Sequence, residues 1–347
     1  MKLDYSAWRR RLPPLLALTV LGIYDLGRAP LSISEQTYIQ AAQAPVATLL
    51  HALYSPLYLL FLHASSTLGQ SAPWLRLSSL AIGLLALIIA ARLVRGLGGA
   101  NAERGALLLL AFSPFLLPQV RTVSAAPLAL LVAVVGFICF LEFLRAGQRQ
   151  WLAAWLGTAL VALLVHGGLY YMVLVQCLGM LFYWERLHNR QRDWWLAQLL
   201  PLAFFLWRFN APLSDYFQNR LDTVFTSATA LLGTGASILS RLLLATAPTS
   251  ALGIVGGILF LLLLAPGLWT CRDFKRDPRH GLLLLGTFVP CLLYLLAPNS
   301  TSYLLAALPF LLTLVAMGIR LYPQWGRQLL WSGITLCLLF SHHRFFF

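Results

Sequence analysis

Apolar residues gather in long runs that recur along the whole chain, separated by short polar or basic stretches. Runs of this kind predict membrane-spanning helices, because about 20 apolar residues in a helix cross the hydrocarbon core of a bilayer. Several runs are shorter, so their helices are expected to extend into the flanking polar residues. The predicted spans are residues 12–26, 77–94, 105–117, 127–144, 152–165, 169–184, 194–207, 252–269, 282–297, 303–319 and 329–340. The pattern therefore predicts an all-α, polytopic bundle of about ten to twelve spans, forming a single membrane domain over residues 1–347.

Basic stretches between the runs predict the orientation of the bundle. The N-terminus carries Lys2, Arg9, Arg10 and Arg11, which favours a cytoplasmic start. Further basic stretches cover residues 92–104, 145–149, 186–192, 272–279 and 320–327. Two predicted spans lie between each neighbouring pair of stretches, so all of them are expected on the cytoplasmic side.

Residues 55–68 form an apolar segment that does not fit a crossing. If this segment spanned the membrane, the basic stretch at 92–104 would face outward and the alternation of sides would fail. We therefore expect interfacial helices in a first outer region, residues 27–74. The other predicted outer segments are residues 118–126, 166–168, 208–250 and 298–302.

Composition agrees with a membrane domain and excludes an ordinary soluble one. Hydrophobic residues make up 59% of the chain and charged residues 10%, with a mean hydropathy of +0.77. The net charge of +14 comes from basic residues at the ends of apolar runs, where they face lipid headgroups, so no nucleic-acid partner is expected. The five cysteines have no metal-ligand spacing and are interpreted as buried thiols. No metal site is predicted, although a divalent ion as cofactor stays open.

Acidic residues are few enough to consider one by one. Those in the predicted cytoplasmic segments lie beside arginines or lysines and are interpreted as charge balance, and Glu142 is expected to pair with Arg145 three residues on. The acids left on the outer side are Asp25, Glu35, Asp215 and Asp222.

Glu35 follows the first span and is the most suggestive of these acids. Ser34 is expected to cap a helix that begins there, and the positive end of that helix favours the charged carboxylate. Such a group can act as a general base towards an acceptor hydroxyl. The alternative is a carboxylate that only supports the start of the helix. Asp25 is the second candidate for the base.

Four further residues are candidates for binding a substrate. Arg121 lies between two spans, and an arginine binds phosphate through its planar fork, although it could equally extend to lipid headgroups. His166, in LLVHGGLYY, breaks an apolar stretch too long for one crossing, and could face a cavity or sit in an interfacial turn. Arg208 and Tyr58 complete the set. Motifs of soluble enzymes are absent, and no intramembrane carboxylate relay supports a proton-coupled transporter.

The order of several segments resembles the GT-C superfamily of polytopic glycosyltransferases, in particular the bacterial relatives of protein O-mannosyltransferases and the lipid A aminoarabinose transferase. SEQTYIQAAQAPVATLLHALYSPLYLLFLH is similar to the family's first outer loop, and APWLRLSSLAIGLLALIIAARLVRGLGG to the segment after it. LLAFSPFLLPQVRTVSAAPLALL resembles the second outer loop, and NSTSYLLAALPFLLTLVAMGI a late helix. The resemblance divides the chain into a GT-C-like module, residues 1–184, and more variable spans, residues 185–347.

This resemblance implies an enzyme of the bacterial inner membrane that transfers a sugar from a polyprenyl-phosphate donor to an acceptor on the outer face. An acidic residue of the first outer loop would be the base, which points to Glu35. The chain departs from the family at Ser34, where an Asp is expected, and at Tyr54-Ser55-Pro56, where the family has His-Pro-Pro. These departures keep a second interpretation open, a catalytically inactive GT-C-like subunit that scaffolds a membrane-protein partner or binds membrane lipids.

Overall fold

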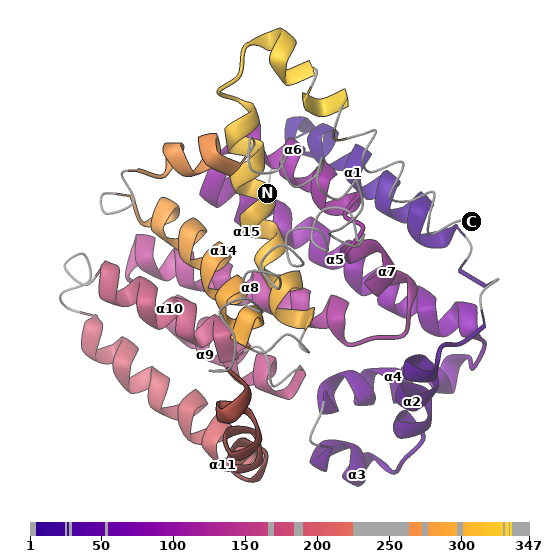
Figure 1. The fold of residues 1–347 in the computed structure, drawn as a ribbon. Helices are drawn as coiled ribbons and strands as arrows, with labels where there is room; N and C mark the ends of the chain where they lie inside the picture. The colour runs from indigo at the N-terminus through magenta and orange to yellow at the C-terminus, as the bar shows by residue number, and fades with distance from the viewer. Residues whose placement is uncertain are drawn as a thin grey trace.

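The computed structural model describes residues 5–24, 26–27, 30–52, 55–165, 170–183, 190–224, 264–272, 277–296, 301–328, 330–332 and 334. Of these, residues 5–10, 51, 170–171, 208–224, 292–296 and 301–304 are described by their backbone alone. All regular structure in this part of the chain is helical, as predicted, and Figure 1 shows the arrangement. The helices are α1 (Tyr5–Ile23), α2 (Ile33–Ala42), α3 (Val46–His51), α4 (Pro56–Leu68), α5 (Ala72–Gly98), α6 (Ala100–Ala111), α7 (Leu116–Arg121), α8 (Ala126–Ala146), α9 (Arg149–Val165), α10 (Tyr170–Phe182), α11 (Gln191–Val224), α14 (Pro278–Leu296) and α15 (Thr301–Ile319).

Two of the described helices, α5 and α8, are long and apolar enough to cross a membrane by themselves. Four shorter apolar helical segments accompany them, at Arg11–Ile23, Arg149–Val165, Met172–Phe182 and Leu305–Ile319. Leu12, Leu16 and Val20 are exposed at intervals of four residues along α1, as expected of a helix that faces lipid on one side. The all-α membrane bundle expected from the sequence is thus the observed fold.

Two predicted boundaries were wrong. The span expected at 105–117 is broken, because α6 ends at Ala111 and α7 begins at Leu116. Pro114 lies in the break, where its ring cannot continue a helix, and the Ser113 hydroxyl accepts from the amides of Phe115 and Leu116. The span expected to end at residue 207 continues as α11 to Val224, because backbone hydrogen bonding does not stop where hydropathy falls.

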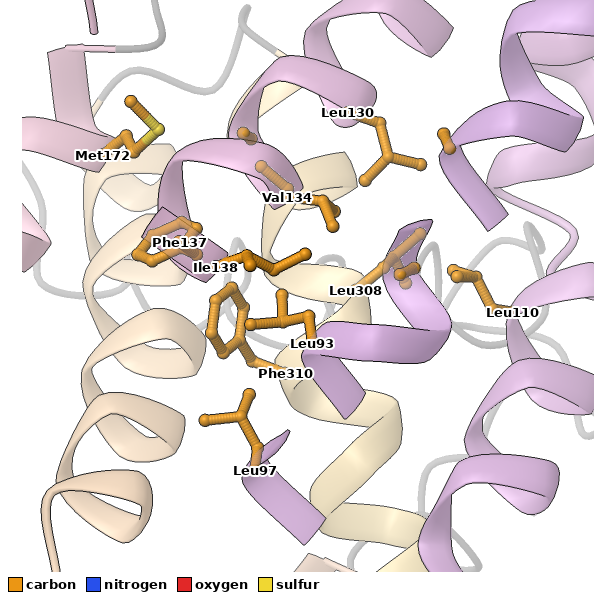
Figure 2. Close-up of a cluster of buried hydrophobic side chains, with 14 of the residues drawn as sticks. Leu93, Leu97, Leu110, Leu130, Val134, Phe137, Ile138, Met172, Leu308 and Phe310 are labelled. Atoms are coloured by element: carbon orange, nitrogen blue, oxygen red, sulfur yellow. The ribbon is translucent and has the colours of Figure 1, made fainter. Parts of the chain in front are cut away.

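The core lies where α5, α8 and α15 meet. Figure 2 shows side chains from α5, α6, α8, α10 and α15 pointing toward one another. Phe137 of α8 and Phe310 of α15 form an edge-to-face pair with ring centroids 4.6 Å apart. Close aromatic and aliphatic packing of this kind fixes the bundle helices against one another.

The described residues of the predicted first outer region form a separate layer of α2, α3 and α4, gathered at one end of the bundle in Figure 1, and we call this layer the outer layer after that prediction. It has a small hydrophobic core of its own, built from Ala42, Leu49, Tyr58, Leu59 and Leu62. Leu75 at the start of α5, together with Val123 and Ala125 before α8, joins the same core. The outer layer is therefore anchored on the ends of two bundle helices.

Candidate functional site

Glu35 is positioned by the start of α2. The N-cap of this helix is Ser32, not the predicted Ser34. The Ser32 hydroxyl accepts from the Glu35 amide at 3.3 Å, and the Glu35 carboxylate accepts from the Ser32 amide at 2.8 Å. This reciprocal capping box satisfies two amides that a helix start otherwise leaves unpaired, and it turns the carboxylate back toward the bundle.

The partner of Glu35 is Arg76, on the second turn of α5. Arg76 Nε donates to Glu35 Oε1 at 2.8 Å, and Arg76 Nη2 donates to Oε2 at 3.0 Å. Both side chains are almost fully buried, with 4% of the arginine and 2% of the carboxylate side chain exposed. The fork of the guanidinium thus meets the carboxylate in a two-point, buried ion pair.

A third segment closes on the same carboxylate. The Val123 amide, in the link between α7 and α8, donates to Glu35 Oε1 at 3.0 Å. Each carboxylate oxygen therefore accepts two hydrogen bonds, one from Arg76 and one from a backbone amide. A carboxylate has about four acceptor positions, so this one is saturated.

These contacts determine the ionisation of Glu35. Burial by itself raises the pKa of a carboxyl group, but the hydrogen bonds from Arg76, Ser32 and Val123 outweigh it and lower the pKa of Glu35 from 4.5 to about 2. Glu35 is therefore charged throughout the physiological range. A carboxylate with such a low pKa takes up a proton poorly.

Arg76 also holds the chain between α1 and α2. Its Nη1 donates to the carbonyl of Leu26 at 2.9 Å, and its Nη2 donates to the carbonyl of Pro30 at 3.0 Å. We call Glu35, Arg76 and the backbone groups of Leu26, Pro30, Ser32 and Val123 the latch. The latch ties the exit of α1, the start of α2, the start of α5 and the α7–α8 link into one unit.

Aromatic side chains of α2 and α4 contact one another in the outer layer. Tyr58 of α4 is fully buried, its hydroxyl lies 3.5 Å from Ser79 Oγ of α5, and its ring meets Tyr38 edge-to-face at 5.4 Å. Burial raises the pKa of Tyr58, and the charge of Glu35 raises it further. His63 Nδ1 lies 2.7 Å from the carbonyl of Ala42, which joins α4 to the end of α2.

The predicted site residues are brought together only in part. Glu35 and Tyr58 belong to the same outer layer, and Arg121 ends the helix that precedes Val123. Arg121 Nη2 donates to the carbonyl of Tyr24 at 2.8 Å, so this side chain also reaches the exit of α1. Asp25 and His166 lie outside the described residues, and Arg208 is described only by its backbone in α11.

Arg76 is the residue that sequence reasoning missed, because it lies between the predicted outer region, residues 27–74, and the span that is predicted to begin at residue 77. The signal was available: residues 36–91 contain no Asp, Glu or Lys, and Arg76 is the one arginine among them. A lone acid and a lone arginine flanking one outer region, both next to apolar runs, are natural partners because each is costly to bury unpaired.

The other carboxylates whose side chains are described behave as predicted for charge balance. Glu103 pairs with Arg11 at 2.7 Å, Asp277 with Arg279 at 2.7 Å, and Glu142 with Arg145 at 3.8 Å. Asp193 pairs with two arginines, described below. No described group of three or more His, Cys, Asp or Glu side chains is arranged to hold a metal ion.

No protein-family model matches the chain, and no curated protein sequence matches it. Two solved structures of ArnT from Cupriavidus metallidurans are similar in fold. The one bound to undecaprenyl phosphate aligns over 96% of this chain and 64% of that chain, with a TM-score of 0.61 and 17% identity. The apo structure aligns over 93% of this chain and 62% of that chain, with a TM-score of 0.61 and 18% identity.

The alignment with ArnT is not confined to residues 1–184, since it covers more than 90% of this chain. This chain spans less than two thirds of the length of either ArnT structure. ArnT is a GT-C aminoarabinose transferase. At this level of identity the likeness establishes the fold. The chain therefore has a GT-C-like membrane fold, as the resemblance of its outer-loop segments implied.

Proposed function

We propose that this protein transfers a sugar from a polyprenyl-phosphate donor to an acceptor on the outer face of the membrane. The observation that carries the proposal is the GT-C-like fold shared with ArnT, one structure of which holds undecaprenyl phosphate. The outer layer of α2, α3 and α4 supports the proposal further. The latch attaches this layer to the bundle, so the layer covers one end of the spans in a fixed position.

In the proposed reaction the acceptor oxygen attacks the anomeric carbon of the sugar. The bond from that carbon to the phosphate oxygen breaks, and the polyprenyl phosphate leaves with the bonding electrons. The proton of the acceptor hydroxyl passes to a carboxylate. The two carboxylates proposed for this role are Asp25 and Glu35.

The geometry of the latch favours Asp25 for the base and a positioning role for Glu35. The Glu35 carboxylate already accepts four hydrogen bonds, and its pKa of about 2 makes it a weak base. Arg76 holds the carbonyl of Leu26, the residue that follows Asp25 in the sequence. Glu35 therefore acts on this stretch of chain through Arg76, and Asp25 is proposed as the reacting carboxylate.

The donor phosphate needs cationic or hydrogen-bonding groups near the membrane surface, and Arg121, His166 and Arg208 are proposed for it. Arg121 Nη2 donates to the carbonyl of Tyr24, which places this guanidinium at the exit of α1. Tyr58, whose ring is buried in the outer layer, is proposed to shape the site and not to contact the donor directly. A bacterial inner membrane with a cytoplasmic N-terminus is the proposed location, because lipid-linked donors then meet the outer layer.

The test is transfer of labelled sugar from polyprenyl-phosphate donors by the purified protein in liposomes. We expect Asp25→Asn to lower the rate by about 100-fold or more at an unchanged melting temperature. Glu35→Gln is expected to lower the rate and the melting temperature together. The matched control, Asp277→Asn, removes a carboxylate that pairs with a neighbouring surface arginine and leaves the rate unchanged.

A fully active Asp25→Asn protein removes Asp25 from the role of base. Loss of rate in Glu35→Gln at an unchanged melting temperature returns that role to Glu35. Absence of transfer from every donor tested, together with no retention of polyprenyl phosphate, contradicts the proposed function itself.

One observation favours a second function, a catalytically inactive GT-C-like subunit. All carboxylates whose side chains are described are engaged with arginines, and the one in the outer layer is saturated. A subunit that binds lipid or scaffolds a partner needs such stable pairs and no free base. Stoichiometric copurification of a membrane-protein partner, without transfer activity, supports this function.

A further inference from the structure

The end of α5 away from the latch carries a cluster of exposed arginines. The 27 residues of α5 extend over about 40 Å, with Arg76 near one end and Arg92 near the other. Four arginines, three near the ends of α5, α8 and α9 and one directly before α11, share two carboxylates, which leaves two positive charges in excess. We call Arg92, Arg145, Arg149 and Arg190 the arginine patch.

The first half of the patch is organised around Glu142, near the end of α8. Arg92 Nη2 lies 3.5 Å from Glu142 Oε1, and Arg145 Nη1 lies 3.8 Å from the same oxygen. Arg145 Nη2 also donates to the carbonyl of Gly96 at 2.8 Å, in the last turn of α5. The carboxylate of Glu142 and the carbonyl of Gly96 hold the guanidinium groups of Arg92 and Arg145 side by side, against the repulsion between their positive charges.

The second half is organised around Asp193, in the first turn of α11. Arg149 Nε lies 3.1 Å from Asp193 Oδ2, and Arg190 Nη1 lies 3.2 Å from it. Arg145 and Arg149 are separated only by the short α8–α9 link, so the two halves are adjacent. The arginine side chains remain exposed, 61% for Arg92 and 75% for Arg149, and keep donors free for a ligand.

An exposed apolar surface begins directly beside the patch. On α11, one turn beyond Asp193, the side chains of Leu196, Leu199 and Leu200 are each more than half exposed. A ligand that fits both features has an anionic head for the arginines and hydrocarbon chains for the leucines. A free phosphate matches only the first feature.

We propose that the arginine patch is a binding site for an anionic phospholipid of the adjoining leaflet, with the phosphodiester on the arginine forks and an acyl chain along α11. Two excess charges suit a headgroup with one or two phosphates. The site lies at the opposite end of α5 from the latch, so it does not depend on the proposed transfer reaction.

The experiment measures lipid binding by the full-length protein, purified in a neutral detergent. Phosphatidylglycerol and phosphatidylcholine of equal chain length are added, and both the melting temperature and the lipids retained in native mass spectrometry are recorded. We expect phosphatidylglycerol alone to raise the melting temperature and to be retained. The double variant R92Q/R149Q is expected to weaken its binding by about 25-fold, or about fivefold per arginine.

The matched control is R320Q/R327Q, which removes two exposed arginines near the end of α15 that lie outside the patch and leaves phosphatidylglycerol binding unchanged. Conservative R92K/R149K keeps the charge but loses the fork, and intermediate binding supports the geometric part of the proposal. Correct folding of each variant is checked by its melting temperature without lipid.

Three outcomes overturn the proposal. The first is equal stabilisation by phosphatidylcholine. The second is equal loss of binding in the patch variant and in R320Q/R327Q, which indicates general attraction to charge. The third is an equal effect of soluble glycerol phosphate, which assigns the patch to a free phosphate.

Discussion

The latch is costly to break because each partner is buried. Removing one member of a buried ion pair leaves an uncompensated charge, at a cost of about 3–5 kcal/mol. We therefore expect Arg76→Gln to lower the stability of the protein by about that amount, measured by thermal unfolding in detergent.

The control for this prediction is Glu142→Gln, which removes an acid from a pair whose arginine Arg92 is 61% exposed. Its expected cost is below about 1 kcal/mol. Equal melting temperatures for the two variants contradict the view that the latch holds the outer layer in place.

The lowered pKa of Glu35 makes the contribution of the latch depend on pH. The pKa of Glu35 falls from 4.5 to about 2 on folding, so the unfolded chain binds the proton more readily. The stabilisation is therefore complete above about pH 4.5 and is lost as the pH falls toward about 2. It amounts to about 3 kcal/mol at neutral pH.

The measurement is the difference in melting temperature between the natural protein and Glu35→Gln as a function of pH. We expect this difference to be constant from about pH 7 to about pH 5 and to narrow below that. A difference that grows on acidification contradicts the assignment of a charged Glu35.

Buried amides on α10 and α11 give a prediction of opposite sign. Both polar atoms of the Gln198 side chain are buried without a hydrogen-bond partner, whereas in Gln176 only Nε2 is unpaired and Oε1 accepts from Trp155 Nε1 at 2.5 Å. An unpaired buried polar group costs free energy, so Gln198→Leu is expected to leave stability unchanged or raise it by up to about 2 kcal/mol.

Gln176→Leu is the comparison, because it leaves the buried indole of Trp155 without its acceptor. Its expected cost is about 1–3 kcal/mol, read from the same thermal unfolding. A large loss of stability in Gln198→Leu shows that a bound water or lipid group pairs with this amide in the membrane.

Single residues of the site were only partly predictable. The scarcity of acidic residues points to Glu35, and the sequence predicts a helix start beside it. The sequence S-I-S-E contains the capping-box spacing from Ser32 to Glu35, so it also allows the observed cap, whereas the prediction of Ser34 is wrong. The role of Arg76 depends on a contact over 41 residues, which no local pattern contains.

At the scale of elements, α5 and α7 approach each other at a glycine. A Cβ atom added at Gly83 would lie 2.4 Å from Val120 Cγ1, too close for the two helices to keep their separation. We expect Gly83→Ala to destabilise the protein by about 1–3 kcal/mol, by thermal unfolding, and to disturb the α7–α8 link that supplies Val123.

Gly157 of α9 is the matched control, since nothing lies within 4 Å of the added Cβ there. Gly157→Ala is expected to be neutral or to stabilise by up to about 1 kcal/mol, because alanine is the better helix former. Equal destabilisation by both substitutions contradicts close packing at Gly83.

The elements predicted best are those whose apolar run has a proline at its start and a glycine after its end. The span expected at 127–144 is α8, which starts with Pro127 in its first turn and ends before Gly147 in the left-handed region. The end of α11 was missed because polar residues inside a continuing helix look like a loop. Hydropathy indicates whether a segment lies in lipid or in water. The length of a helix depends instead on how far its backbone hydrogen bonds continue.

At the scale of the whole molecule, the proposed orientation places the outer layer and the arginine patch on opposite sides of the membrane. A cysteine introduced at Gln40, exposed on α2, is expected to react with an impermeant maleimide in intact cells. A cysteine at Arg327 is expected to react only after the membrane is permeabilised. The unsubstituted protein gives the background from its own cysteines.

The reverse pattern of labelling contradicts both the cytoplasmic N-terminus and the proposed location of the site. The basic stretches predicted which ends of the helices share a side, and the arginine patch is consistent with that grouping. How the outer layer is seated on the bundle was not predictable in the same way, since it depends on contacts among four separate segments.

The reciprocity of the latch has a consequence for its natural variation. A chain that loses Glu35 keeps a buried guanidinium without a counter-ion, and a chain that loses Arg76 keeps a buried carboxylate in the same position. Either intermediate is poorly tolerated, so the two positions should change together during evolution. Natural variants with a neutral residue at position 35 should therefore also have a neutral residue at position 76.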